Sequence, residues 1–351
     1  MSLLEQTNEI ITILKSKKPD IIENIVPDLY WLAPYVVKQE WEKLGDKVKE
    51  RETLGSSSHS IDGSKWISLR LDGSKFSSVV KMLRNKGIIE PQGFSYKFAK
   101  CMQDICLKLI EHFNASLGFT QSDEVIIFIP PSINKNGDLQ EHYRNGRVIK
   151  IASLAAGIAS SKFMGSLTEF CIKSNNIELI FEINKILPHF DCRLGYYNSW
   201  EEAKSLLLWR AYDCSVNGIS DAVHQSNDGK KIVKENTFNK IKWLYENSYN
   251  KINISLLPRH QAYGTLYRKT KRVIIQLNRN PKREDTDSAL VAKERKFIEK
   301  ENLPILDLEI KGWLDNAERE SDHENKLIGV VENFPKYDNL MKSLKNLIYK
   351  N

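Results

Sequence analysis

The stretch WISLRLDGSKF, residues 66–76, decides the fold. Its first half alternates apolar with polar side chains, and this period of two predicts a β-strand. The alternation is typical of a half-buried strand, with Ile67, Leu69 and Leu71 on its apolar face. Asp72 and Gly73 follow directly, so we expect a carboxylate at the point where the strand ends.

The tetrapeptide Asp-Gly-Ser-Lys occurs twice in this neighbourhood, at residues 62–65 and at residues 72–75. The first copy follows the polar run GSSSHSI, where Asp-Gly is typical of an ordinary turn in a linker. The second copy follows the predicted strand. We therefore expect Asp62 to be a turn residue and Asp72 to carry chemistry.

A second carboxylate is expected beside Asp72. After a segment with helical spacing at residues 94–114, two apolar runs flank QSDE at residues 121–124, which predicts a hairpin with an acidic turn. If these strands are neighbours in one sheet, Asp72 and Asp123 converge at one edge. Carboxylates held that close repel each other, and a divalent cation such as Mg²⁺ relieves the repulsion. Glu124 is either a further ligand or a solvated turn residue.

The composition is that of a soluble globular protein, because 41% of the 351 residues are hydrophobic and 28% are charged. No apolar run reaches the roughly 18 residues that span a bilayer. The five cysteines form no Cys-x-x-Cys pair, which favours a reducing compartment. Acidic residues near the N-terminus match secretory and transit peptides poorly. We expect a cytoplasmic protein with no membrane partner, and a mitochondrial location stays open.

Positive charge is concentrated in one block. Residues 258–283 hold eight lysines and arginines and no acid, whereas the net charge of the whole chain is +7. Such a block is typical either of phosphate contacts or of a solvated strand and loop.

The changing pattern predicts three parts of the chain. They are a helical N-terminal extension and linker (1–62), a catalytic domain that ends with the basic block (63–283), and a mostly helical C-terminal extension (284–351). Within the central part, GRVIKIASLAAGIASSKFMGSLTEF and EEAKSLLLWRAYDCSVNGISDAVHQ predict helices, and HFDCRLGYY predicts a strand.

Six motifs carry a resemblance to a known family when they are taken in order. They are LRLDG (69–73), FTQSDEV (119–125), GRVIK (146–150), FDCR (190–193), LLWRAYDC (207–214) and LPRHQAYGTLYRK (257–269). The ordered set resembles the histidine-tRNA guanylyltransferase superfamily, and within it the guanylyltransferase-like branch of 3′-5′ RNA polymerases. The resemblance spans about residues 66–272.

The resemblance implies an α+β fold with a polymerase- and cyclase-like palm, which is a ferredoxin-like βαββαβ sheet with helices. It implies nucleotide addition to the 5′ end of tRNA after the 5′-phosphate has been activated by ATP or GTP. The implied partners are tRNA, ATP, GTP and other nucleoside triphosphates. The implied cofactor is Mg²⁺, two ions per active site, and the implied assembly is a homotetramer.

The resemblance also implies roles for individual residues. Asp72 and Asp123 would be the catalytic carboxylates and would bind the metals with the Gly73 carbonyl, with Glu124 as a further candidate ligand. The expected nucleotide and triphosphate contacts are Gly73, Ser74, Lys75, Phe76, Ser122, Arg147 and Lys150. The expected tRNA contacts are Arg193, Arg259, Arg268, Lys269, Lys271 and Arg272. Asp213 and Asn217 are expected to support the site structurally.

Departures from the family pattern bear on the substrate. The guanylyltransferases proper continue their Asp-Cys with His-Ile-Asn-Asn-Leu-Tyr-Asn, whereas residues 215–221 here read SVNGISD. Ser77 stands at a family histidine, and Glu90 stands at a family lysine for which Lys86 is an alternative. These differences favour templated 5′-end repair of truncated tRNA. Dedicated guanosine addition to histidine tRNA is the alternative.

Other functions are compatible with paired aspartates. A palm-type nucleotide cyclase shares them, but the chain lacks a Gly-Gly-(Asp/Glu)-Glu-Phe-like signature. The basic block at residues 258–283 would also have no role in such an enzyme. A non-catalytic tRNA-binding protein built on a decayed palm would not need both aspartates. His189 and Cys192 have no second pair, so a structural role outweighs a zinc site. We expect Cys214 and Trp209 to pack in the core.

Overall fold

The computed structural model of the protein describes residues 38–91, 95–225, 231–236, 239–240, 243, 264–277 and 290–300. Arg259 lies outside these residues, as do residues 1–37 of the expected N-terminal extension and residues 301–351 of the C-terminal one.

The described residues form one six-stranded sheet in which every neighbouring pair is antiparallel. The strands are β1 (Trp66–Gly73), β2 (Leu117–Gln121), β3 (Glu124–Ile129), β4 (Phe190–Tyr197), β5 (Thr265–Leu277) and β6 (Leu290–Lys300). Their order across the sheet is β4-β1-β3-β2-β5-β6. The first four strands and their helices thus follow the βαββαβ order that was expected, and the fold is mixed α and β.

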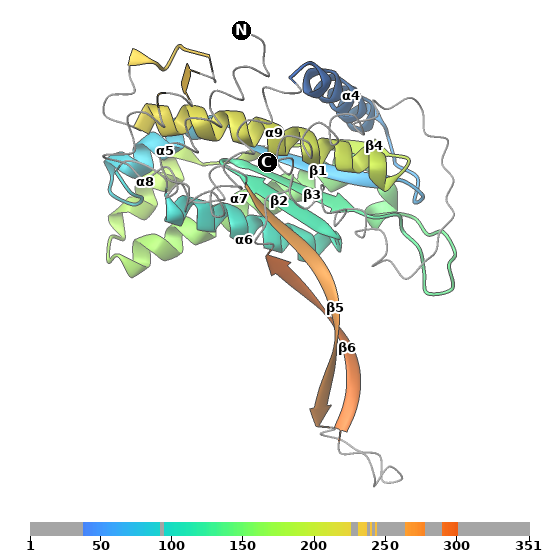
Figure 1. Cartoon of the computed structure of the whole chain (residues 1–351). Helices are drawn as coiled ribbons and strands as arrows, with labels where there is room; N and C mark the ends of the chain where they lie inside the picture. Colours follow the sequence, from blue (N-terminus) through green and yellow to red (C-terminus); the bar gives the residue numbers. More distant parts are fainter. Residues whose placement is uncertain are drawn as a thin grey trace, which may run out of the picture.

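Helices cover both faces of this sheet (Figure 1). On one face lie α6 (Tyr96–Phe113), which contacts β2 and β3, and α7 (Val148–Lys173), which contacts β4 and β1. On the other face lie α4 (Lys38–Ser57), which contacts β4, and α9 (Trp200–Gln225), which contacts β1 and β4. The shorter helices are α5 (Phe76–Asn85), η3 (Tyr143–Gly146) and α8 (Glu178–Ile186).

Strand β1 is buried on both faces, so the expectation of a half-buried strand is wrong. Leu69 and Leu71 are 0% exposed in the apolar core beneath α6 and α7. On the opposite face, Ser68 and Arg70 are also buried, because α4 and α9 lie over them. Trp200 of α9 packs there against Trp66, with ring centroids 5.0 Å apart. The polar residues of β1 face partners in these helices and in β4 rather than water.

Helix α4 is an integral part of this body, although the sequence assigned it to an extension. Its side chains Leu44 and Val48 are 2% and 0% exposed. The helix continues through Gly55 to Ser57. Gly55 approaches the Leu194 carbonyl of β4 so closely that a Cβ would lie within 3.0 Å of it. Glycine here allows the helix to pack onto the strand.

The segment Leu290–Lys300 is a strand, where the sequence predicted a mostly helical extension. It pairs with β5 from Tyr267↔Lys300 to Leu277↔Leu290. The local pattern does not encode this pairing, because a strand depends on the neighbour that completes its hydrogen bonds. Of β5, only the Thr265–Arg268 end pairs with β2. The rest of the β5–β6 ribbon projects from the body (Figure 1).

Helix α7 is long and apolar enough, by length and composition, to cross a membrane. In this structure it packs on the sheet through Ile151, Ala155, Ala159 and Phe163, which recur every four residues and are buried. A sheet-covering core helix has the same length and composition as a membrane span.

Candidate active site

Asp72 and Asp123 meet at one edge of the sheet. Strand β1 pairs with β3 so that Asp72 lies opposite Glu124, the residue that follows Asp123. The backbone N–H of Gly73 donates a hydrogen bond of 3.1 Å to the carbonyl oxygen of Asp123. This bond ties the end of β1 to the β2–β3 turn. The convergence of the two aspartates, expected from the sequence, is therefore present in the structure.

The two carboxylates affect each other electrostatically. Burial and the neighbouring Asp72 carboxylate raise the pKa of Asp123, while hydrogen bonds from its own backbone and from Ser122, together with the charge of Arg210, oppose the rise. Asp72 and Asp123 both remain partly exposed. A pair of this kind is destabilised when both groups are ionised, and a bound cation removes that cost.

The donor set fits a small hard cation. Within the described part of the chain, no group of three or more His, Cys, Asp or Glu side chains is placed to hold a metal. The ligands expected at this edge are the carboxylates of Asp72 and Asp123 and the carbonyl of Gly73, and this set stays a prediction. Mg²⁺ is bound in this way, by one or two carboxylates with water and substrate phosphates filling the remaining positions.

The backbone around the pair is unusual. Lys75 and Ser122 adopt left-handed conformations with φ of 56° and 49°, which for residues other than glycine cost of order 1–3 kcal/mol and occur often at functional sites. Lys75 caps α5 without a side-chain hydrogen bond to its first turn. The first N–H groups of α5 therefore lie immediately after Asp72 and Gly73, where a helix N-terminus favours anions.

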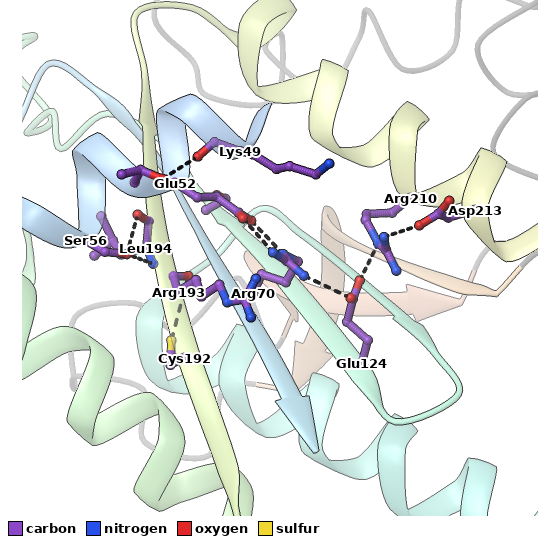
Figure 2. Close-up of polar contacts among 12 residues, drawn as sticks. Lys49, Glu52, Ser56, Arg70, Glu124, Cys192, Arg193, Leu194, Arg210 and Asp213 are labelled. Atoms are coloured by element: carbon purple, nitrogen blue, oxygen red, sulfur yellow. Dashed lines mark hydrogen bonds and ion pairs between the residues drawn. The ribbon is translucent and has the colours of Figure 1, made fainter. Parts of the chain in front are cut away.

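Glu124 is buried in a network of ion pairs (Figure 2). Its side chain is 7% exposed, so the solvated-turn interpretation is wrong. Oε1 accepts a hydrogen bond of 2.7 Å from Arg210 Nε, and Oε2 accepts one of 3.3 Å from Arg70 Nη1. Burial raises the pKa of Glu124, whereas Arg210 and Arg70 lower it. A role of Glu124 as a metal ligand stays a prediction, and both its oxygens already have partners.

The network extends to α4 and along α9 (Figure 2). Arg70 donates two hydrogen bonds of 2.6 Å to the carboxylate of Glu52 on α4. Arg210 Nη1 donates to Asp213 Oδ2 at 2.5 Å. Three contributors to this network were not expected from the sequence: Arg70, Glu52 and Arg210. The alternation of β1 offered a signal for one of them, because Arg70 lies two residues before Asp72 and hence on the same face.

Among the residues expected to contact the triphosphate near the aspartates, some lie at the sheet edge and one lies in the core. Ser74, Lys75 and Ser122 lie beside the aspartates. Phe76 belongs to the core instead, with 2% exposure and its ring centroid 4.8 Å from that of Phe190. Any contact between Phe76 and a nucleotide would therefore come from its backbone.

Arg147 and Lys150 lie at the other end of the sheet. Arg147 precedes α7 and forms a bridge with Ser60, just before the chain enters β1. Asp72 lies near the opposite end of this eight-residue strand, which spans roughly 25 Å. The structure does not bring Arg147 and Lys150 beside the aspartates of their own chain, and their contact with triphosphate stays a prediction.

The expected tRNA contacts lie on β4 and β5. Arg193 is exposed on β4, in register with Arg70. On β5, the Lys269 ammonium donates a hydrogen bond of 2.7 Å to Asn114 Oδ1, and burial together with Lys296 lowers the pKa of Lys269 to about 8. Arg268 is half-buried, while Lys271 and Arg272 lie opposite Lys296 and Arg295 of β6.

The two residues expected to support the site lie on α9. Asp213 joins the ion-pair network through Arg210, which agrees with a supporting role. Asn217 is exposed on the same helix.

Two further acids lie near the site and were missed. Asp191 stands opposite Asp72 across the β1–β4 pair. Asp221 of α9 interacts electrostatically with Asp123. Burial raises the pKa of Asp221, and the Asp123 carboxylate adds to the rise while His224 and Arg84 oppose it. In the motif FDCR, the sequence pointed only to Arg193. The position of Asp191 beside Asp72 depends on the register of β4 with β1.

The other sulfur and histidine candidates have structural surroundings. Burial raises the pKa of Cys192 and of Cys214, which disfavours a thiolate at either position. The His189 ring nitrogen Nδ1 lies 2.8 Å from the Leu187 carbonyl oxygen. Trp209 contacts Arg210, whose guanidinium carbon lies 4.8 Å from the centroid of the indole ring.

Comparison with known proteins places the site in a family. Residues 45–198 match the tRNAHis guanylyltransferase family model, and the match includes both aspartates. This region resembles the histidine-tRNA guanylyltransferase superfamily, as the ordered motifs do. The match identifies the protein as a nucleotidyltransferase and supports nucleotidyl addition at the 5′ end of tRNA in general. The match begins inside α4, in agreement with the packing of that helix on the sheet.

Individual relatives are distant. An uncharacterised protein of Acanthamoeba polyphaga mimivirus is 28% identical over 237 residues, which cover 65% of this chain and 77% of the relative. A bacterial tRNA(His) guanylyltransferase-like protein in complex with ATP superposes with a TM-score of 0.51 at 22% identity, covering 77% of this chain and 97% of that chain. The tRNA(His) guanylyltransferase of Saccharomyces cerevisiae gives a TM-score of 0.46 at 21% identity, with 60% and 88% covered. The likeness to the bacterial structure shows a shared fold.

Proposed function

We propose that this protein repairs the 5′ end of truncated tRNA by adding nucleotides in the 3′-5′ direction, with base pairing to the opposite strand selecting each nucleotide. The observation that carries the proposal is the meeting of Asp72 and Asp123 at one sheet edge inside the region that matches the family. The sequence SVNGISD at residues 215–221 supports repair over dedicated guanosine addition, because it departs from the signature of the guanylyltransferases proper.

Asp72, Asp123 and the Gly73 carbonyl would hold Mg²⁺. When bound there, Mg²⁺ would supply stabilisation of the negative charge on the oxygens around the reacting phosphorus. The aspartates fix where the reacting phosphate lies. The N-terminus of α5 and the Lys75 side chain then receive the remaining phosphates of a nucleoside triphosphate. Its 3′-hydroxyl oxygen bonds to the activated 5′-phosphorus of the tRNA and loses its proton to water, while the bond to the activating nucleotide breaks and AMP or GMP leaves.

Basic residues outside this edge would hold the tRNA. Arg268, Lys269, Lys271 and Arg272 all lie on β5, where they would meet the tRNA backbone and make binding dependent on salt. Arg147 and Lys150 lie far from the aspartates of their own chain. In a homotetramer they would contact substrate held at the site of another copy.

A nucleotide-addition assay tests the proposal. A 5′-truncated, 5′-phosphorylated tRNA is incubated with the protein, ATP, Mg²⁺ and all four nucleoside triphosphates. We expect extension in which the added nucleotide changes when the opposing base is changed. Asp123→Ala, which removes one carboxylate, should give no extension. Failure of the wild type to extend, or equal extension by the variant, contradicts the proposal.

The second candidate is guanosine addition to histidine tRNA, which the description of the matched family favours. The same assay with histidine tRNA separates the two functions. Addition of guanosine whatever the opposing base supports the second candidate. Binding of tRNA without extension indicates a non-catalytic protein, and conversion of ATP or GTP alone into a cyclic product indicates a cyclase.

A further inference from the structure

The edge that carries Asp72 and Asp123 also carries a third acid, Glu124. We propose that Arg210 is a positioning residue that keeps the Glu124 carboxylate off the metals, so that Asp72 and Asp123 hold them without it. The inference rests on the proposed metal site and concerns how α9 shapes it.

The position of Glu124 would otherwise allow it to join the metal ligands. It lies directly opposite Asp72 across the β1–β3 pair, and side chains at opposite positions share a face with Cβ atoms roughly 4.5–5.5 Å apart. A cation held by Asp72 would be within reach of a glutamate at that distance. Yet Glu124 forms no metal-holding group with the two aspartates among the described residues. Its oxygens contact Arg210 and Arg70 instead.

Arg210 provides the shorter of the two contacts. Its Nε lies 2.7 Å from Glu124 Oε1, whereas Arg70 Nη1 lies 3.3 Å from Oε2. The two 2.6 Å hydrogen bonds of Arg70 are made to Glu52. Glu124 is 7% exposed, and an ion pair at a buried position is screened little by salt. The side chain of Glu124 is therefore held chiefly by Arg210.

Arg210 is itself fixed in place. Its Nη1 is 2.5 Å from Asp213 Oδ2, and its guanidinium carbon lies 4.8 Å from the centroid of the Trp209 ring. Both partners are on α9, which packs on β1 and β4. The guanidinium is thus oriented toward β3 by its own helix, without a contribution from the metal site.

Anchoring Glu124 also anchors the neighbouring Asp123. The Glu124 carbonyl oxygen accepts a hydrogen bond of 3.0 Å from Thr120 Oγ1, which closes the base of the β2–β3 turn. With its side chain held by Arg210 and its backbone by Thr120, Glu124 leaves the adjacent aspartate little freedom. The same contact excludes one carboxylate from the metals and positions another.

The test compares the wild type with Arg210→Met, which keeps an unbranched apolar stem and removes the charge and hydrogen bonds of the guanidinium. Mn²⁺ stands in for Mg²⁺, and its binding to the full chain without nucleotide is followed from the electron paramagnetic resonance of free Mn²⁺. We expect Arg210→Met to bind Mn²⁺ at least three-fold more tightly, because Glu124 is released to act as a ligand. We also expect tRNA extension to slow at least ten-fold.

Two further variants separate ligand release from loss of charge. Adding Glu124→Gln to Arg210→Met should return the Mn²⁺ affinity to the wild-type value, because an amide is a poor ligand. Arg193→Met removes an equal charge from β4, and it should leave the Mn²⁺ affinity unchanged. Arg210→Lys retains the charge, and should show a smaller change in the same direction if Arg210→Met does not fold.

The proposal is overturned if the folded Arg210 variants bind Mn²⁺ with unchanged or weaker affinity, since Arg210 would then only support the fold. It is also overturned if Glu124→Gln fails to reverse the gain. Failure of the underlying metal site looks different. In that case the wild type and an Asp72→Ala, Asp123→Ala double variant would bind Mn²⁺ equally.

Discussion

The two Asp-Gly-Ser-Lys copies have the same sequence and different structures. In the first copy, the Asp62 side chain bonds within the tetrapeptide. Its Oδ1 accepts a hydrogen bond of 2.9 Å from the Ser64 N–H and another from the Ser64 hydroxyl. In the second copy, the N–H of Ser74 donates instead to the His189 carbonyl oxygen at 2.9 Å. Asp72 thus ends a strand held on both sides. A four-residue motif does not fix its own structure, and the neighbouring strands decide it.

The pKa shifts of the aspartates at the two copies have opposite directions. Hydrogen bonds from Ser64 lower the pKa of the exposed Asp62. At the other copy, burial and the charge of Asp72 raise the pKa of Asp123. The first aspartate is stabilised by its own turn, whereas the pair at the second copy is kept in an unfavourable arrangement that a cation would relieve.

The largest expected effect is on catalysis. Asp72→Ala should reduce tRNA extension by at least about 10³-fold, because it removes electrostatic stabilisation of the transition state. Asp62→Ala should reduce it less than about two-fold, since a turn residue of this kind contributes to local structure alone. The rate of single-turnover extension measures both. Similar losses at the two positions would contradict the expected difference between Asp72 and Asp62, and would show that the Asp72 edge is not the active site.

The second-largest expected difference is between the effects of replacing the glycine of each copy, Gly63 and Gly73. A Cβ at Gly63 would collide with the backbone carbonyl of Gln140, and one at Gly73 would collide with the ring of Phe76. We expect either alanine to lower the free energy of unfolding by roughly 1–3 kcal/mol. Denaturant unfolding measures this loss. Gly73→Ala should also slow extension by the folded protein, whereas Gly63→Ala should not. A catalytic defect confined to Gly63→Ala would contradict the assignment.

The smallest expected effect is on the stability of the metal-free protein. A carboxyl whose pKa is raised on folding binds its proton more tightly in the folded state, so its contribution to stability falls as the pH rises above the ordinary value of 3.8. Asp123→Asn should therefore raise the free energy of unfolding at pH 7 in a chelator by roughly 0.5–2 kcal/mol.

Asp62 provides the control with the opposite sign. Because its pKa is lowered from 3.8, its contribution is present above that pH and is lost as the pH falls through the folded value. Asp62→Asn should lower the melting temperature slightly. If both asparagine variants shift the melting temperature in the same direction, the electrostatic contrast is wrong.

Much of the fold could be predicted from local pattern. The alternation of β1, the helical spacing of α6, α7 and α9, and the acidic turn between β2 and β3 all appear in the structure, because each reflects a repeat along the chain. The residues that complete the surroundings of the site could not be predicted in this way. Glu52, Arg70 and Arg210 come from separate elements, and nothing local relates their positions.

The sequence by itself determined that Asp72 lies at the end of a strand, that Asp123 lies in a turn and that Asp62 is a turn residue. Each of these follows from residues within a few positions along the chain. The tertiary structure alone decided that β1 is buried on both faces, that α4 belongs to the body and that Leu290–Lys300 is a strand. It also decided that Glu124 faces two arginines. These outcomes depend on which elements pack together, and burial and ion pairing between distant segments are properties of the assembled fold.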